Sequence, residues 1–164
     1  MNHFRNRCRV LLLLLILTGA ACSSGSGTIS APLRVTARTV EDTVMLEQTP
    51  TATYFDVTGI VRNDDSREIK VAASCTPEAE RDIDGTWTVV FTPACPDNVL
   101  NPLLPGDSLV IRAHVAGYTN AVPQLDPRMT AGRYRLVFGV FAIDSQNPTA
   151  SIAQRQVSTP FTVK

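Results

Sequence analysis

Apolar and polar residues alternate in short runs from residue 33 to the end of the chain, and turn-forming residues separate these runs. Successive side chains of a β-strand point to opposite faces, so this alternation predicts strands that bury one face. No window holds apolar residues at helical spacing without an intervening proline or glycine. We therefore expect an all-β domain in which seven or eight strands form two packed antiparallel sheets.

The parity of each run predicts which side chains enter the core between the sheets. Trp87 belongs to this predicted core because it shares its parity with Val89 and Phe91. Further strands are expected over residues 33–40 and 43–47. The predicted core comprises Phe55, Val57, Val61, Ile69, Val71, Ala73, Cys75, Trp87, Val89, Phe91, Leu109, Ile111, Ala113, Val115, Tyr134, Leu136, Phe138, Val140, Val157, Phe161 and Val163.

The first 21 residues have the three parts of an export signal. Arginines precede an apolar run over residues 10–17, which is shorter than the roughly 20 residues that span a bilayer. The run Leu17-Thr18-Gly19-Ala20-Ala21-Cys22 then resembles the lipobox of bacterial lipoproteins. This resemblance implies cleavage before Cys22 and attachment of lipid, including palmitate, to the new N-terminus. Ordinary secretion, with Cys22 as a free thiol, is the alternative.

The lipobox implies an organisation in three parts. Residues 1–21 are a signal peptide, residues 22–32 are the lipidated cysteine and a flexible Ser/Gly-rich tether, and residues 33–164 are the folded domain. The membrane is then a partner through the N-terminal lipid, and the location is the cell envelope. Ser23 instead of aspartate after the cysteine favours the outer membrane, facing the periplasm or the cell surface.

The other cysteines fit this organisation. Cys8 lies in the segment to be removed, so Cys75 and Cys95 remain as a pair. In an oxidising compartment they are expected to form a disulfide, and two reduced thiols are the alternative. A simple hairpin between their strands would keep the two sulfurs too far apart for that bond.

The disulfide therefore requires one more reversal of the chain. Asp84-Gly85 is a favoured type I′ turn pair, so residues 78–83 are expected to form a short, polar edge strand. This layout sorts the loops into two groups. Residues 63–66, the Asp84-Gly85 turn and residues 116–131 are expected at one end, and residues 93–106 and 144–150 at the other.

Charge and side-chain chemistry exclude several function classes. Without the signal, 12 basic residues stand against 15 acidic ones, a net charge of about −3 that does not favour nucleic acid. His114, the one histidine after Cys22, is expected to be exposed and solitary beside Arg112, and no motif frames a catalytic serine. The acids near Asp84 lack the further ligands of a calcium loop. We expect no catalytic residue, cofactor, metal site or small-molecule substrate.

Two turn motifs resemble a known family. Pro105-Gly106-Asp107-Ser108 enters one strand and Gly132-Arg133-Tyr134 opens another, with Asn63 and Asp84-Gly85-Thr86-Trp87 at further matching points. This pattern, over roughly residues 55–143, is similar to the BsuPI family, named for an intracellular proteinase inhibitor of bacilli. The resemblance implies an immunoglobulin-like sandwich. It also raises inhibition of an extracytoplasmic protease as a function.

Two surfaces are candidates for binding a partner. The segment 116–131 is long for a connection and contains Tyr118, Leu125 and Met129, which either bind a partner or plug the end of the sandwich. Val137 and Phe141 alternate away from the core and form either an exposed apolar stripe or a second buried face. We expect a non-catalytic interaction or scaffolding module that binds an envelope protein, with protease inhibition through an end loop as the alternative.

Overall fold

The computed structural model describes residues 31–73, 77–95, 99–118, 129–143 and 151–164. No helix long and apolar enough to cross a bilayer occurs among these described residues. Their strands are β1 Val35–Thr39, β2 Thr43–Val44, β3 Glu47–Gln48, β4 Ala52–Asn63, β5 Ile69–Ala72, β6 Glu78–Ile83, β7 Thr86–Phe91, β8 Leu100–Leu103, β9 Ser108–Tyr118, β10 Gly132–Ile143, β11 Ser151–Val157 and β12 Phe161–Val163.

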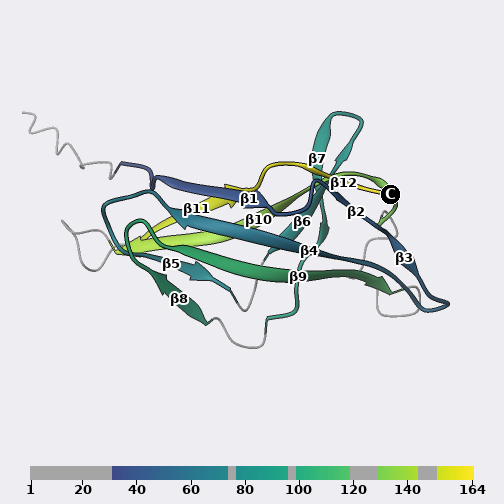
Figure 1. The fold of residues 1–164 in the computed structure, drawn as a ribbon, viewed down its shortest axis with the longest axis horizontal. Helices are drawn as coiled ribbons and strands as arrows, with labels where there is room; N and C mark the ends of the chain where they lie inside the picture. Colours follow the sequence, from purple (N-terminus) through teal and green to yellow (C-terminus); the bar gives the residue numbers. More distant parts are fainter. Residues whose placement is uncertain (1–30, 74–76, 96–98, 119–128, 144–150) are drawn as a thin grey trace, which may run out of the picture.

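The strands form two sheets that pack as an immunoglobulin-like β-sandwich, which confirms the predicted fold class (Figure 1). Sheet A has four strands and is centred on β4, which pairs with β9 along one side and with β1 and β3 along the other. Sheet B has eight strands and is centred on β10, which pairs with β11, β12, β5 and β6. All pairings are antiparallel except that of β2 with β12. The expected strand number was too low, because β8 lies in a predicted loop and β11 was not expected.

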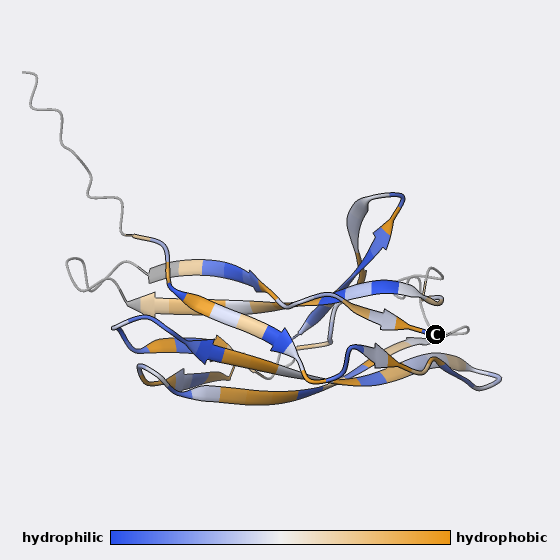
Figure 2. Ribbon diagram, turned by 45° about the horizontal axis from the view of Figure 1, so that its top comes forward, coloured by the Kyte–Doolittle hydropathy of each residue, from blue (hydrophilic) through white to orange (hydrophobic). Residues whose placement is uncertain are grey.

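Most of the predicted core is confirmed. Along the strands, hydrophobic and hydrophilic residues alternate as Figure 2 shows. Phe55 lies at the aromatic centre, with ring centroids 5.2 Å from Tyr134 and 5.9 Å from Phe161 in edge-to-face arrangements. The predicted core residues that are buried are Phe55, Val57, Val61, Ile69, Val71, Ile111, Ala113, Val115, Tyr134, Leu136, Phe138, Val140, Phe161 and Val163.

Strand β7 departs from the predicted parity. Trp87 and Phe91 are only partly buried, Val89 is 38% exposed, and Val90 is the buried residue. The pairing of β6 with β7 shifts register at Val90, which has no opposite residue. Such a β-bulge changes the face to which the flanking side chains point. The prediction that Trp87 lies in the core was therefore wrong.

The hairpin of β6 and β7 forms as expected, but β6 is not an edge strand. Asp84 and Gly85 both have positive φ, 52° and 83°, as a type I′ turn requires. However, β6 lies between β7 and β10. Its pairing with β10 ends at Arg81, so the rest of the hairpin projects from the sandwich, as both Figure 1 and Figure 2 show.

The predicted grouping of loops was also wrong in part. The Asn63 N–H donates to the Asp107 carbonyl at 3.0 Å, and the Gly106 N–H donates to the Asn63 carbonyl at 2.8 Å. Residues 63–66 and 105–108 therefore meet at one end. Strand β8 brings the second turn there by pairing with β5, and its Pro102 is tolerated because β8 is an outer strand.

Two polar contacts shape the strand ends around β10. The Tyr134 hydroxyl donates to the Thr130 carbonyl at 2.6 Å, which makes the Gly132-Arg133-Tyr134 motif a tyrosine corner. Ser158 exchanges hydrogen bonds with the Leu136 backbone, both 2.9 Å long, through its own N–H and its hydroxyl oxygen. The chain leaves β11 at this point, so Val157 is 38% exposed, and the prediction that it lies in the core was wrong.

A buried asparagine organises the turn after β4. Asn63 is fully buried, and its amide donates to the carbonyls of Arg67 at 2.8 Å and Leu103 at 2.9 Å. Its side-chain oxygen accepts the Asp65 N–H at 3.0 Å. Asn63 thus links the turn to β8, the outer strand of sheet B, and leaves no side-chain polar atom without a partner.

The same turn fastens the start of the domain. The Asp65 carboxylate accepts the Arg67 Nε–H at 2.8 Å and the Arg34 N–H at 3.0 Å. Arg67 also donates to the Ala31 carbonyl at 3.3 Å. The hydrogen bonds from Arg67, together with the Arg34 N–H, hold the pKa of Asp65 well below its usual range. The chain therefore enters the sandwich at the end where residues 63–66 lie.

Gly59 lets the two sheets approach, and its replacement tests the packing. A Cβ at this position would lie 2.6 Å from the Phe138 Cζ atom, so Gly59→Ala should destabilise the domain by about 1–3 kcal/mol. Gly139→Ala is the matched control, because its Cβ would meet its nearest neighbour at 3.5 Å. Urea unfolding of the domain gives both values, and equal stability of the two variants would contradict this account.

The Asp65 contacts predict a pH dependence of stability. Because folding lowers the Asp65 pKa, its contribution is present above the ordinary carboxyl pKa of about 4 and is lost as the pH falls below that value. Asp65→Asn should be less stable at neutral pH and lose less stability on acidification. Asp64→Asn, which removes the 36% exposed carboxylate beside it, should retain the wild-type acid dependence. Urea midpoints over a pH series measure both slopes.

Candidate functional site

The outer face of sheet B carries a network of charges between β6, β10 and β11. Arg135 lies opposite Glu80, and its Nε–H donates to the Glu80 carboxylate at 2.6 Å. The Arg155 guanidinium donates to the same carboxylate at 3.1 Å and to Glu78 at 2.9 Å. Glu80 is buried, so these two cations are what make its burial tolerable.

The path of Arg155 explains why Val137 is buried on the outer face, which was one of the two alternatives for this residue. Arg155 lies on β11 opposite Gly139, whereas both of its acidic partners lie on β6, across β10. Its side chain must therefore pass over β10 next to Val137. Val137 is only 2% exposed and Phe141 is partly buried. The predicted stripe thus proved to be largely covered, and Val137 is not part of a free surface.

Trp87 extends this network onto the hairpin. The Arg135 Cζ atom lies 4.4 Å from the Trp87 ring centroid, and that of Arg133 lies 5.6 Å from it. Both distances are within cation–π range. Arg133 also lies 3.9 Å from the Asp82 carboxylate, which in turn accepts the Gly85 N–H at 2.9 Å.

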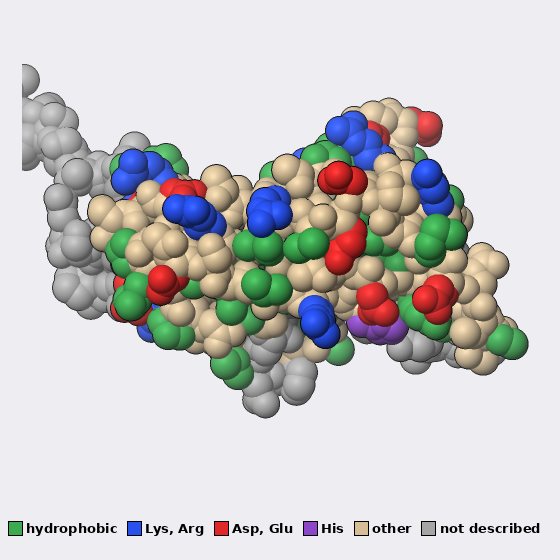
Figure 3. All heavy atoms as spheres, in the orientation of Figure 1, with side chains coloured by type: hydrophobic (Ala, Val, Ile, Leu, Met, Phe, Trp, Pro, Cys, Tyr) green, Lys and Arg blue, Asp and Glu red, His purple; other side chains and the backbone are tan. Residues whose placement is uncertain are grey.

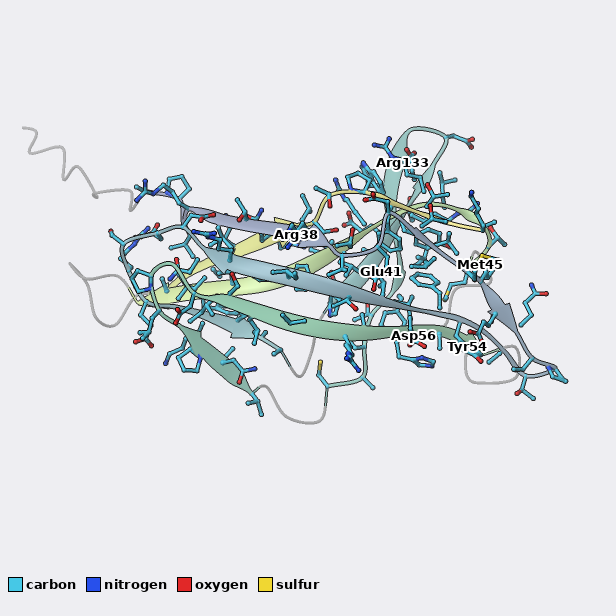
Figure 4. All side chains as sticks on the ribbon, in the orientation of Figure 1. Arg38, Glu41, Met45, Tyr54, Asp56 and Arg133 are labelled. Atoms are coloured by element: carbon cyan, nitrogen blue, oxygen red, sulfur yellow. The ribbon has the colours of Figure 1, made fainter. Side chains whose placement is uncertain are left out.

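We call this set the arginine–tryptophan surface. Arg133 lies at the base of the projecting hairpin in Figure 4. The three cations of this surface are balanced by three acids, and its only aromatic ring, that of Trp87, is partly exposed. Tryptophan and arginine are the residue types that most often dominate binding energy at protein interfaces. The surface comprises Glu78, Glu80, Asp82, Trp87, Arg133, Arg135 and Arg155.

Sequence parity contained part of the signal for this surface. Arg133 and Arg135 alternate with the buried residues of β10, which places both on the outer face. The position of Trp87 beside them depends on the bulge at Val90, and the parity of β7 alone does not reveal it. Arg155 was missed because β11 has only a weak alternation.

The outer face of sheet A carries a second polar cluster, around His114. The His114 Nδ1 atom lies 2.8 Å from an Asp56 carboxylate oxygen, and the His114 ring lies 5.2 Å from that of Tyr54. His114 is exposed as predicted, but it is not solitary. The Tyr54 hydroxyl donates to Glu47 at 2.5 Å, and this carboxylate raises the pKa of Tyr54.

We call the side chains that point to the outer side of the two paired strands the β4–β9 face. Figure 4 shows Tyr54 and Asp56 side by side on it, and Figure 3 views the face directly. Its cross-strand pairs follow from the register of β4 and β9. The face comprises the pairs Tyr54 with Ala116, Asp56 with His114, Thr58 with Arg112, Ile60 with Val110, and Arg62 with Ser108.

One residue of the long segment 116–131, Met129, contributes to the core. Met129 is 5% exposed and belongs to the main apolar cluster, with its sulfur packed beside Gly117. It plugs the sandwich, which was one of the two alternatives. Tyr118 ends β9, where its backbone pairs with Ala52, and Leu125 lies outside the described residues.

The remaining predicted sites are not tested by the structure. Cys22 and Cys75 lie outside the described residues, and Cys95 is exposed after β7. The disulfide between Cys75 and Cys95 and the lipid on Cys22 therefore stay predictions. In the part of the chain that the structure describes, no three His, Cys, Asp or Glu side chains form a group that could hold a metal ion.

Comparisons with known proteins do not identify a family. No protein-family model and no curated protein matches the chain, so the BsuPI resemblance stays a prediction. The chain is similar at the level of fold to the Northeast Structural Genomics Consortium target SoR45, with 14% identity, 80% of this chain and 83% of that one covered, and a TM-score of 0.42.

Two further solved structures are similar to a lower degree. For the PapD-like domain 7 of human CEP192 the identity is 13%, the coverage 84% of this chain and 91% of that one, and the TM-score 0.37. For the N-terminal domain of PorA the identity is 13%, the coverage 80% and 98%, and the TM-score 0.34. The immunoglobulin-like sandwich is therefore identified from the strand pairing of the chain itself.

Proposed function

We propose that this chain is a lipid-anchored, non-catalytic interaction module of a bacterial cell envelope, and that it binds an envelope protein through the arginine–tryptophan surface. The observation that carries this proposal is the position of Trp87. It lies opposite Asp82 in the projecting hairpin, partly exposed, with two guanidinium groups against its ring. A rigid aromatic side chain held in this way loses little entropy on binding a partner.

The arrangement of the surrounding charges favours binding of a partner over catalysis. Glu80 is held by Arg135 and Arg155, and Arg133 is paired with Asp82. Because these groups are fixed by one another, the surface is pre-organised and has almost no net charge. A partner would be selected by shape and by hydrogen bonds to the arginines, with Trp87 as the apolar anchor.

Lipid on Cys22 and a disulfide between Cys75 and Cys95 belong to the same proposal. The domain begins next to the turn of residues 63–66, where Arg67 and Asp65 hold residues 31 and 34. The tether of residues 22–32 would therefore leave from one end of the sandwich. The projecting hairpin lies toward the other end, which leaves it accessible above a membrane (Figure 1).

Cys22→Ser tests the anchor. We expect this variant to incorporate no radiolabelled palmitate in a bacterial host and to lose its association with the membrane through lipid. Cys8→Ser is the matched control, because Cys8 lies in the segment that would be removed, and it should be labelled like the wild type. Labelling of the Cys22→Ser variant, or none of the wild type, would show that the chain is not a lipoprotein of this kind.

Trp87→Ala tests the binding surface. With a photoreactive residue in place of Thr86, which is exposed at the hairpin, we expect a discrete cross-linked adduct with an envelope protein. Trp87→Ala should lower the yield of that adduct about tenfold or more, as truncation of an interface anchor costs about 2 kcal/mol. Met45→Ala, which truncates a side chain that is 67% exposed elsewhere, should leave the yield unchanged. Equal yields for both variants would remove Trp87 from the interface.

The alternative function, inhibition of an extracytoplasmic protease, was assigned to residues 116–131. Of these, residues 119–128 lie outside the described residues. The alternative predicts that the domain slows extracellular proteases and that its potency is independent of Trp87. Such an outcome would favour inhibition over the interaction module.

A further inference from the structure

We propose that two copies of this chain associate through the β4–β9 face, with a two-fold axis that runs along the direction of these strands. This surface is on the sheet opposite to the arginine–tryptophan surface, so the inference goes beyond the proposed function. In Figure 3, apolar side chains gather in the middle of this face, and charged side chains flank them.

The middle of the face is apolar. Val110 is 60% exposed, and Ile60, which lies opposite it on β4, is partly exposed. Two adjacent apolar side chains on a sheet face that is otherwise polar are not explained by the core of their own chain. An apolar centre with a polar rim is the usual composition of a protein interface.

The charges beside this centre are complementary to themselves. Asp56 on β4 lies opposite His114 on β9, and Arg112 is the next outward residue on β9. The Asp56 side chain is 71% exposed. Arg112 is also exposed and makes no ion pair within the described residues. Beside the apolar centre the face therefore has its acid on β4 and two cations on β9, while Arg62 at the far end of β4 is paired with Asp64.

A two-fold axis along the strands exchanges these two strands. When two such faces meet, β4 of one copy lies over β9 of the other, so that each contact occurs twice. Asp56 of one copy then lies over His114 of the second copy and beside its Arg112. Ile60 of each copy lies over Val110 of the other, so the interface has four apolar side chains at its centre.

The same axis fits attachment to one membrane, an argument that depends on the proposed lipid anchor. With the axis along the strands, both domains point the same way, and both tethers leave at the end where residues 63–66 lie. An axis in the interface but across the strands would send the two tethers to opposite ends. Anchoring in one bilayer also raises the effective concentration of the two copies.

Charge reversal of Asp56 and Arg112 tests the inference. The full-length chain in non-ionic detergent is studied by sedimentation velocity over a concentration series, with the bound detergent measured separately. We expect the wild type to reach the protein mass of two copies. Asp56→Lys and Arg112→Glu should each shift the measured protein mass toward that of one copy, because each substitution places like charges across the interface. Lys70→Glu, a charge reversal on sheet B, is the control and should remain at two copies.

A mixture of the two variants is decisive. Lys at position 56 of one chain would lie beside Glu at position 112 of the other, while the second copy of the contact stays wild type, so the mixture should recover two copies. Recovery would also prove that both variants are folded. A wild type that stays at one copy, single variants that stay at two, or a mixture that is not restored would each overturn the inference. None of these outcomes depends on palmitate labelling, so failure of the anchor is recognised separately.

Discussion

Strand β10 is the element on which the rest of the structure depends, because its inner face is buried and its outer face is partly covered. Its inner face supplies Tyr134, Leu136, Phe138 and Val140, all fully buried, to the core between the sheets. Its edges pair with four other strands. Its outer face would be open to solvent in a simple sandwich, but the Arg155 side chain crosses it to reach β6. A strand covered in this way leaves little freedom in register for its neighbours.

The cover on β10 is ionic, which has a different consequence from an apolar cover. Burying Glu80 costs free energy that its pairs with Arg135 and Arg155 offset, so the network adds little net stability over an apolar equivalent. Removal of either arginine would leave the buried Glu80 carboxylate with one of its two cations and would be costly. The network therefore fixes positions more than it stabilises the domain. One position that it fixes is that of the Arg135 guanidinium, on which the Trp87 ring packs.

The alternation of apolar and polar residues predicted the sandwich, the strands β4, β9 and β10 and most of the core, because a regular strand has a strict period of two. It failed where that period is interrupted. The bulge at Val90 moved Trp87 out of the core, and the turn at Ser158 separated Val157 from Phe161. Pairings between strands far apart in sequence were equally hidden. Thus β6 was expected at an edge, the exposure of Val137 stayed open, and His114 was expected without Asp56.

The two outer faces differ in how their charges are satisfied, and this should divide their roles. On sheet B each acid of the arginine–tryptophan surface has a cation from its own chain, so a partner gains little from added charge and must use Trp87 and shape. Binding there should depend only weakly on salt, since few unpaired charges are brought together. On sheet A, Arg112 makes no ion pair within the described residues. Its attraction to Asp56 of a second copy is electrostatic, so salt should screen it. The salt dependence of each association therefore identifies the face that mediates it.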